Sequence, residues 1–153
     1  MSSTHTNLLF HIVFSTKYRR NTIHESDRLY EYLGGIIRES KGTLVEIGGM
    51  PDHVHILARL SPTIAISDVL RTVKTNSSKW LNETFQSSIP FAWQRGFGAF
   101  SVSPSSVDQV RRYIQNREEH HKHLSFRDEH RQFLIRHGIG FDERFLFEEE
   151  TTT

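Results

Sequence analysis

The stretch TLVEIGGMPDHVHILARL, residues 43–60, predicts a β-hairpin. Residues 43–47 and 53–60 are rich in β-branched and other apolar side chains, which is typical of strands. Between them, Gly-Gly-Met-Pro-Asp is a turn sequence, because glycine accepts positive φ at little cost and Pro51 cannot extend a ladder of hydrogen bonds. We therefore expect two antiparallel strands joined by a turn over residues 48–52.

The flanking segments extend this hairpin with one more strand and two helices. Residues 8–14, LLFHIVF, are β-branched and aromatic and too short for a core helix, so they predict a central strand. Residues 26–39 carry apolar side chains at helical spacing, and Gly42 ends this helix. A second helix begins with Ser67 as its N-cap. Its buried stripe comprises Ile66, Leu70, Val73, Ser77, Trp80 and Leu81.

The next part of the chain predicts a strand and the helix that follows it. Residues 91–102 form the strand, and their glycines indicate a bend or a bulge. Ser106 with Gln109 three residues later is a capping-box pattern, which opens a helix through Tyr113 to about residue 121. Val107, Val110 and Ile114 form its buried stripe, so we expect Tyr113 at the edge of the core with its hydroxyl directed outward.

A final helix over residues 127–137, closed by Gly138, completes the expected order. Strand, helix, strand, strand, helix, strand is the split β-α-β pattern of a ferredoxin-like α+β sandwich, an antiparallel sheet with helices on one face. The other face stays available for a functional site, and the C-terminal helices are additions. We expect one domain, residues 1–153, with an ordered core over about residues 7–147 and a frayed acidic tail at residues 148–153.

Bulk composition excludes several classes of protein. The formal net charge of +1 means that any nucleic-acid site is a local basic patch and not a field of the whole molecule. The chain has no cysteine, which excludes disulfides and thiolate metal sites and suits the cytoplasm. No stretch approaches the roughly 20 apolar residues of a membrane span, so we expect no membrane partner.

The pair His53 and His55 is a candidate metal site. Side chains two apart on a strand project from the same face, so both imidazoles can reach one ion while Val54 and Ile56 point into the core. The alternative of two ordinary strand histidines stays open on spacing alone. A histidine-triad hydrolase is excluded, because it requires a third histidine at position 57, which is leucine.

Basic residues gather in two places that could neutralise the phosphates of a nucleic acid. The first group is Lys17, Arg19 and Arg20, at the end of the first strand. The second group lies on the helix of the tyrosine and comprises Arg111, Arg112 and Arg117. A solvated surface without a ligand is the alternative reading of both groups.

Four stretches, in this order, resemble the HUH transposases with one catalytic tyrosine, the IS200-like insertion-sequence class. They are HIVFSTKYRR (11–20), MPDHVHIL (50–57), FAWQRGFGAFSV (91–102) and VRRYIQNREEHH (110–121). An ordered set of four is much more specific than any one of them. Relatives in this class include domesticated proteins that act on repeated palindromes.

The resemblance implies a ferredoxin-like fold with the HUH site on the sheet, where His53 and His55 hold a divalent cation, Mg²⁺ or Mn²⁺. It implies that Tyr113 attacks a phosphodiester of single-stranded DNA and leaves a 5′-phosphotyrosine. The substrate is expected at element ends and is often read through an imperfect hairpin. The resemblance also implies a homodimer in which the tyrosine helix of one subunit serves the histidines of the other.

This sequence departs from the family at one position. The family commonly carries glutamine four residues after the tyrosine as a third metal ligand, and here that residue is Arg117, which has no acceptor atom. Glu118 or His121 could substitute, or water could fill the site, and of these we favour Glu118. Two alternatives to the transposase remain. The Arg117 departure favours a non-catalytic or domesticated protein that binds nucleic-acid hairpins on the same fold, and the other alternative is a metal-dependent phosphoesterase that uses water.

Overall fold

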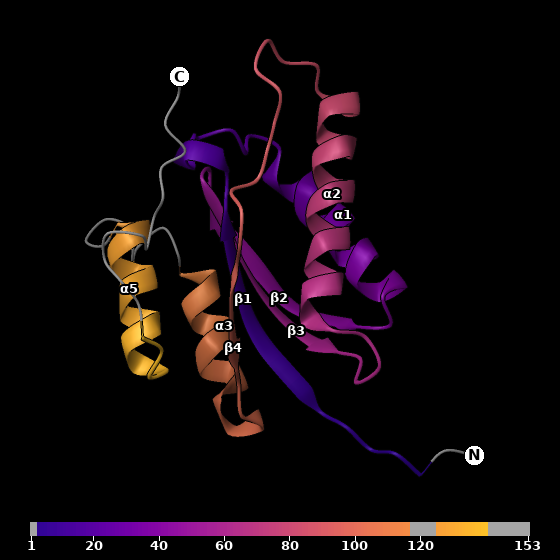
Figure 1. The fold of residues 1–153 in the computed structure, drawn as a ribbon, viewed down its shortest axis with the longest axis vertical. Helices are drawn as coiled ribbons and strands as arrows, with labels where there is room; N and C mark the ends of the chain where they lie inside the picture. The colour runs from indigo at the N-terminus through magenta and orange to yellow at the C-terminus, as the bar shows by residue number, and fades with distance from the viewer. Residues whose placement is uncertain (1–2, 117–124, 141–153) are drawn as a thin grey trace.

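A computed structural model describes residues 3–116 and 125–140 of the chain (Figure 1). The strands are β1 (Leu8–Ser15), β2 (Thr43–Met50), β3 (His53–Leu60) and β4 (Gly98–Ser101). The helices are α1 (Ser26–Glu39), α2 (Ile66–Thr84), α3 (Val107–Gln115) and α5 (Phe126–Arg136), with short 3-10 turns η1 (Lys17–Arg19) and η2 (Pro104–Ser106). Among the described residues, no helix is both long and apolar enough to cross a membrane.

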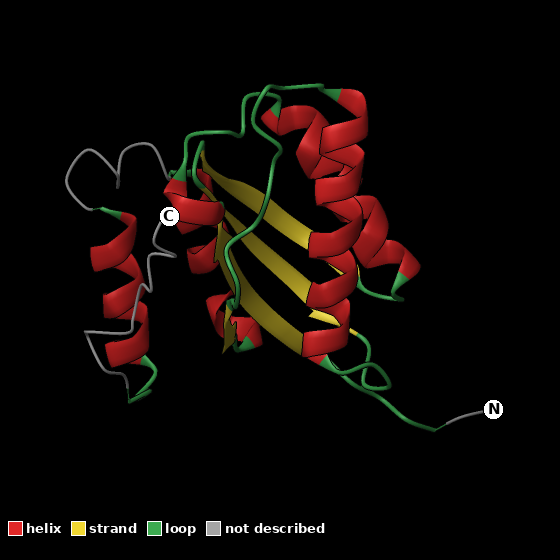
Figure 2. Cartoon of the chain, turned by 45° about the horizontal axis from the view of Figure 1, so that its top comes forward, coloured by secondary structure: helices red, strands yellow, loops and turns green. Residues whose placement is uncertain are grey.

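The sheet has the strand order β2-β3-β1-β4, and every neighbouring pair is antiparallel. This order, with α1 and α2 packed together on one face, confirms the predicted ferredoxin-like α+β sandwich (Figures 1 and 2). The C-terminal helices α3 and α5 lie on the opposite face, the one that the sequence left available for a site (Figure 1). One face of the sheet is thus covered by α1 and α2, and the other by α3 and α5.

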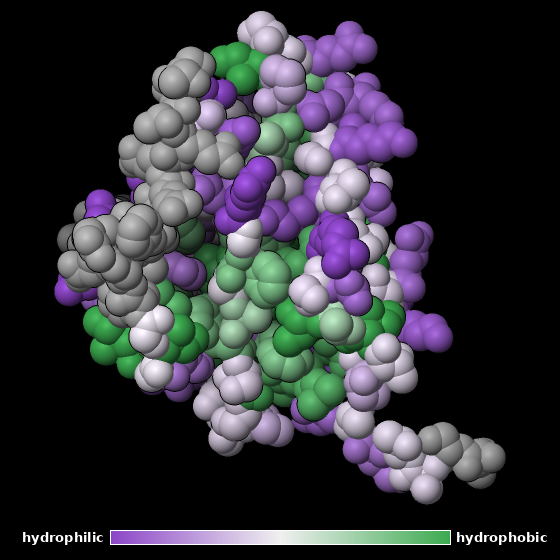
Figure 3. Space-filling model, viewed as in Figure 1, coloured by the Kyte–Doolittle hydropathy of each residue, from purple (hydrophilic) through white to green (hydrophobic). Residues whose placement is uncertain are grey.

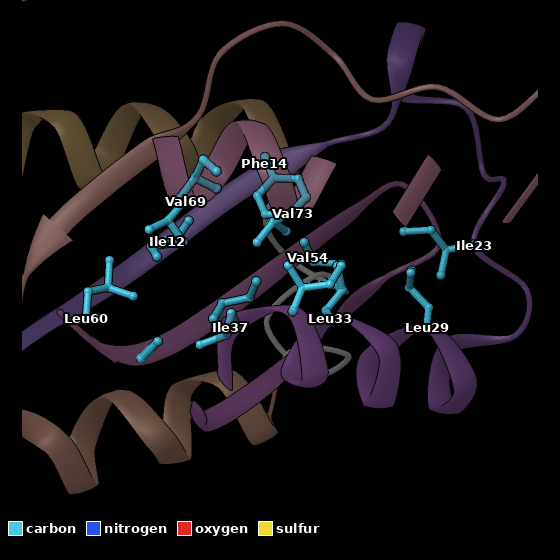
Figure 4. Close-up of a cluster of buried hydrophobic side chains, with 14 of the residues drawn as sticks. Ile12, Phe14, Ile23, Leu29, Leu33, Ile37, Val54, Leu60, Val69 and Val73 are labelled. Carbon is cyan, nitrogen blue, oxygen red and sulfur yellow. The ribbon is translucent and has the colours of Figure 1, made fainter. Parts of the chain in front are cut away.

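The main core fills the space between the sheet and the α1–α2 layer. Alternate residues of the central strands point into it, and each fully buried aliphatic side chain contributes about 1.5–3 kcal/mol relative to its exposed state. Figure 4 labels members of this core: Ile12, Phe14, Val54 and Leu60 from the sheet, Leu29, Leu33 and Ile37 from α1, and Val69 and Val73 from α2. Hydrophilic side chains gather on the outer side of this helix layer in Figure 3, as amphipathic helices require.

The hairpin turn is tighter than the sequence predicted. Strand β2 continues to Met50, so only Pro51 and Asp52 separate it from β3. The prediction that Gly48 and Gly49 supply positive φ in the turn was wrong, since neither has it. Both glycines are strand residues at a crowded position: a Cβ on Gly48 would lie 2.9 Å from Ile114 Cγ2 of α3, and one on Gly49 would lie 2.9 Å from Val54 Cα. Their small size permits close approach of neighbouring segments.

Several predicted boundaries also changed. The sequence predicted a strand over residues 91–102, but β4 comprises only Gly98–Ser101. Trp93 of the remaining segment forms an isolated β-bridge to Thr16. Helix α2 begins at Ile66, one residue before the predicted cap Ser67. These differences follow from contacts between distant segments, which decide how far a strand is paired.

The helix of the tyrosine is shorter than expected. Helix α3 ends at Gln115 and does not reach residue 121, and Ser106 makes no side-chain capping bond. Helix α5 matches its prediction to within one residue, with Ser125 accepting a bond from the Asp128 N–H and Gly138 in a left-handed conformation at its end.

Candidate active site

His53 and His55 lie side by side on the face of the sheet opposite the main core. Both side chains are 0% exposed, and their ring centroids are 5.3 Å apart. They alternate along β3 with Val54 and Ile56, which belong to the main core, as the strand pattern predicted. The structure therefore brings the two histidines together on the face that α3 and α5 cover.

A carboxylate from α5 completes this group. Glu129 is 2% exposed, and its Oε1 atom lies 2.9 Å from His55 Nε2 and 3.9 Å from His53 Nε2. One ligand atom from each of the three residues lies within 4.8 Å of the others. A buried carboxylate is costly unless it is paired or coordinates a cation, and two imidazoles with a carboxylate are a donor set that divalent metals accept.

The Nδ1 atom of each of these histidines also lies within hydrogen-bond distance of another side chain. His53 Nδ1 lies 2.6 Å from Asp52 Oδ1, and His55 Nδ1 lies 2.7 Å from His11 Nε2. Because both Nδ1 atoms have these neighbours, both Nε2 atoms are the ones next to Glu129. Metal-binding histidines commonly use a hydrogen bond at one ring nitrogen to orient the other toward the ion.

Tyr113 reaches the same group from α3. Its hydroxyl donates a hydrogen bond to Glu129 Oε2, and its ring centroid lies 5.9 Å from that of His55. The ring also contacts Phe133 of α5 edge to face at 5.6 Å. The prediction placed the hydroxyl at the outer edge of the core, whereas the half-buried side chain turns inward to Glu129. One chain thus contains the tyrosine, both histidines and the carboxylate in contact.

Helix α3 is held close to the sheet by the absence of a side chain at Gly48. A Cβ there would lie 3.0 Å from the Ile114 carbonyl oxygen, and Ile114 directly follows Tyr113. Strand β2 forms one edge of the sheet, and its Glu46 Oε2 accepts a hydrogen bond from Gln115 and lies 3.5 Å from Arg111 Nε. These contacts determine the height of Tyr113 above the sheet.

The neighbouring His130 contributes to the electrostatics of this face. Burial lowers the pKa of its imidazole below the usual value, and the negative charge of Glu129 partly offsets that effect. Its ring stacks on Phe126, which in turn contacts His53 with a centroid distance of 4.5 Å. Aromatic rings of α5 thus pack beside the three donor groups, all of which are buried.

The predicted basic residues fall into two separate places. Lys17, Arg19 and Arg20 form η1 and its end, a segment that bonds to the β2–β3 turn through Thr16 N to Asp52 O at 2.8 Å. Arg111 and Arg112 lie exposed on α3. Arg117 and Glu118 lie outside the described residues.

The sequence interpretation missed three residues of this group. Glu129 carried a usable signal, because Phe126, Glu129 and Phe133 fall on one buried face of α5 and a carboxylate within an apolar stripe is unusual. His11 alternates with Ile12 and therefore shares the face of His55. Asp52 directly precedes His53, yet nothing local indicates that it contacts the ring.

Known proteins match most of this chain. The family model described as "Transposase IS200 like" matches residues 4–117. The transposase for insertion sequence element IS200 of Salmonella typhimurium (strain LT2) is 27% identical over 132 residues, covering 80% of this chain and 84% of the relative. The ISDra2 transposase TnpA of Deinococcus radiodurans is 24% identical over 119 residues, covering 73% of this chain and 85% of the relative.

Solved structures share the fold. A crystal structure of a Deinococcus radiodurans R1 protein assigned as a transposase has a TM-score of 0.62 and 25% identity, and the match covers 76% of this chain and 95% of that one. A REP-associated tyrosine transposase bound to a REP hairpin has a TM-score of 0.57 and 14% identity, covering 76% and 72%. At 14% identity the second match shows similarity of fold alone.

Proposed function

Because the chain belongs to the IS200-like transposase family, we propose that it cleaves and rejoins single-stranded DNA through a 5′-phosphotyrosine at Tyr113. The observation that supports this most directly is the meeting of the Tyr113 hydroxyl, His53, His55 and Glu129 at one buried place. A nucleophile beside a candidate cation site is an arrangement that suits metal-assisted phosphodiester transfer.

The donor set fits a divalent cation held by the Nε2 atoms of His53 and His55 and by the carboxylate of Glu129. A bound Mg²⁺ or Mn²⁺ would polarise the scissile phosphate and offset its developing negative charge. Imidazole is a ligand of transition metals more than of hard cations, so of the two we expect Mn²⁺ to bind more tightly. In this proposal Glu129 is the third metal ligand, the role for which the sequence interpretation favoured Glu118.

In the proposed reaction, the Tyr113 oxygen forms a bond to phosphorus and the bond to the 3′-oxygen breaks, which leaves a free 3′-hydroxyl. The hydrogen bond to Glu129 orients the phenol for this attack. The phosphotyrosine retains the energy of the phosphodiester, so a second 3′-hydroxyl can reverse the step on a new strand. Neutral imidazoles at His53 and His55 are required for metal ligation.

The proposed substrate is single-stranded DNA that carries a hairpin. The solved relative bound to a REP hairpin motivates this choice, since it has the same fold. We propose that Lys17, Arg19 and Arg20 at the β2–β3 turn contact backbone phosphates, and that the α3 side chains Arg111 and Arg112 do so together with Arg117. Binding should therefore weaken steeply as salt concentration rises.

A non-catalytic hairpin-binding protein remains the second candidate, because Arg117 removes the usual glutamine. Incubation with labelled single-stranded DNA from the flanks of its own gene, with Mg²⁺ or Mn²⁺, separates the two. We expect a covalent protein–DNA complex that survives denaturation. DNA binding without any adduct supports the hairpin reader, and free cleaved product without an adduct supports a phosphoesterase that uses water.

Gly48→Ala tests whether the position of α3 controls this reaction. The added Cβ would overlap Ile114, so we expect α3 to shift and adduct formation to fall about 10- to 100-fold. Gly35→Ala on α1 is the matched control, because its Cβ meets nothing closer than Arg38 Nη2 at 3.8 Å. Equal adduct yield in the two variants would show that the Gly48 contact does not position Tyr113.

We further propose a homodimer that exchanges its tyrosine helices, as the family resemblance implies. An exchanged element makes in the partner the contacts that it makes within one chain, so the contact of Tyr113 with Glu129 is compatible with exchange. Mixing Tyr113→Phe chains with His55→Ala chains should then restore adduct formation that neither variant supports alone. If dimers that contain one chain of each variant are silent, each chain uses its own tyrosine.

A further inference from the structure

A cavity of about 430 Å³ lies directly beside Tyr113, between β4, α3 and α5. Its aromatic lining comes from His11 of β1, Phe100 of β4 and Phe133 of α5. Tyr113 itself forms part of the wall. The cavity thus shares Tyr113 and His11 with the surroundings of the candidate active site and lies on the side of Tyr113 that β4 and α5 enclose.

The aromatic rings of this cavity are held in fixed orientations. Phe100 and Phe133 are stacked with centroids 5.5 Å apart, and His11 meets Phe133 edge to face at 5.0 Å. His11 is in turn bonded to His55. Phe100 also stacks on His137 at 4.6 Å, so these rings form a fixed wall that loses little conformational freedom when a planar ligand packs against it.

Polar side chains line the rest of the cavity. Gln109 of α3 carries both a donor and an acceptor, Ser103 carries a hydroxyl, and Arg136 of α5 carries a guanidinium whose Cζ lies 6.0 Å from the centroid of Phe133. This combination can recognise the edge of a base and an adjoining phosphate at once.

We propose that this cavity binds one unpaired nucleobase of the strand under attack, a nucleotide next to the phosphodiester presented to Tyr113. The inference rests on the proposed function for the position of that phosphodiester. A volume of about 430 Å³ falls within the range of about 300–1,000 Å³ typical of small-ligand sites, and a single base with its sugar fits there. A base adjacent to a reacting phosphate in single-stranded DNA is free to leave the stack and enter such a pocket.

Photo-crosslinking tests this site without requiring cleavage. The Tyr113→Phe chain would be irradiated with a short single-stranded oligonucleotide of mixed sequence in which 5-iododeoxyuridine replaces thymidine, and crosslinked peptides would be mapped by mass spectrometry. We expect crosslinks at Phe100, Phe133 or His137, all of which line the cavity. Crosslinks found only elsewhere, for example at Tyr18 or Trp93, or no crosslinks at all, would overturn the proposal.

Affinity for the same oligonucleotide provides the second measurement. Phe133→Leu keeps an apolar side chain but removes the ring, so binding should weaken about 5- to 100-fold. If that variant is poorly folded, Arg136→Gln replaces it, with Arg71→Gln on α2 as a control that removes the same charge far from the cavity. Equal affinity of Arg136→Gln and Arg71→Gln would argue against the cavity as a base site.

The two proposals fail in different ways. If the wild-type chain forms a covalent adduct but no crosslink maps to the cavity, the transferase proposal stands and the base pocket is wrong. If crosslinks map to the cavity while no adduct forms with either metal, the pocket stands and the chain is a DNA-binding protein without strand transfer.

Discussion

Tyr113→Phe is expected to abolish the covalent protein–DNA adduct, with a loss of at least about a thousand-fold, while single-stranded DNA binding is retained. The substitution removes only the phenolic oxygen that would attack phosphorus. The ring keeps its contacts with Phe133 and with the histidines, so the architecture of the site should persist. The measurement is denaturing electrophoresis of the protein with labelled DNA in the presence of Mn²⁺.

The matched control is Tyr32→Phe. Tyr32 lies on α1 and stacks on Trp80 at 4.6 Å, on the face of the sheet that carries no candidate site. Its hydroxyl should have no influence on adduct formation. An adduct that persists at wild-type yield in Tyr113→Phe would remove this residue from the role of nucleophile, and transfer would then depend on another side chain.

A loss of metal binding is the second large effect, expected for His55→Ala and for Glu129→Ala. Each change removes one of three donors, so affinity for Mn²⁺ should fall at least about 100-fold, measured by calorimetry or by electron paramagnetic resonance on the purified chain. Adduct formation should fall in parallel. Because the readout is metal binding, the result does not depend on finding the correct DNA.

Glu118→Ala is the comparison that distinguishes the two candidate third ligands. The sequence favoured Glu118, whereas the geometry favours Glu129, whose Oε1 lies 2.9 Å from His55 Nε2. We expect Glu118→Ala to bind Mn²⁺ like the wild type. If instead Glu118→Ala loses the metal and Glu129→Ala keeps it, the carboxylate of α5 serves only to hold Tyr113, and the donor set proposed above is wrong.

Much of the fold followed from local patterns. The alternation of β3, the helical spacing of α1 and the capping of α5 each depend on neighbours in sequence, and each element was predicted to within one or two residues. Strand β4 was predicted poorly, because its pairing with β1 depends on contacts about 90 residues apart. The turn was misjudged for a related reason: Gly48 and Gly49 serve the approach of α3 and β3, not the turn.

Part of the candidate site could likewise be predicted from local patterns, and part could not. The pair of histidines on one face follows from the two-residue period of a strand, and the four ordered motifs pointed to Tyr113 and to the transposase family, which the comparisons support. The roles of these side chains stay predictions until the substitutions above are made. The buried face of α5 marked Glu129 as unusual and the alternation of β1 placed His11 on the face of His55, but no pattern within the sequence showed that Glu129, Asp52 and His11 contact these side chains.

The sequence by itself determined the order and type of most elements, the face of β3 that carries the histidines, and the family. Only the tertiary structure decided that α5 returns over that face, so that Glu129, 74 positions after His55, lies between the imidazoles and the Tyr113 hydroxyl. The physical reason is that side-chain periodicity acts over a few residues, whereas the placement of α5 comes from the packing of Phe126 and Phe133 against strands that are distant in the chain.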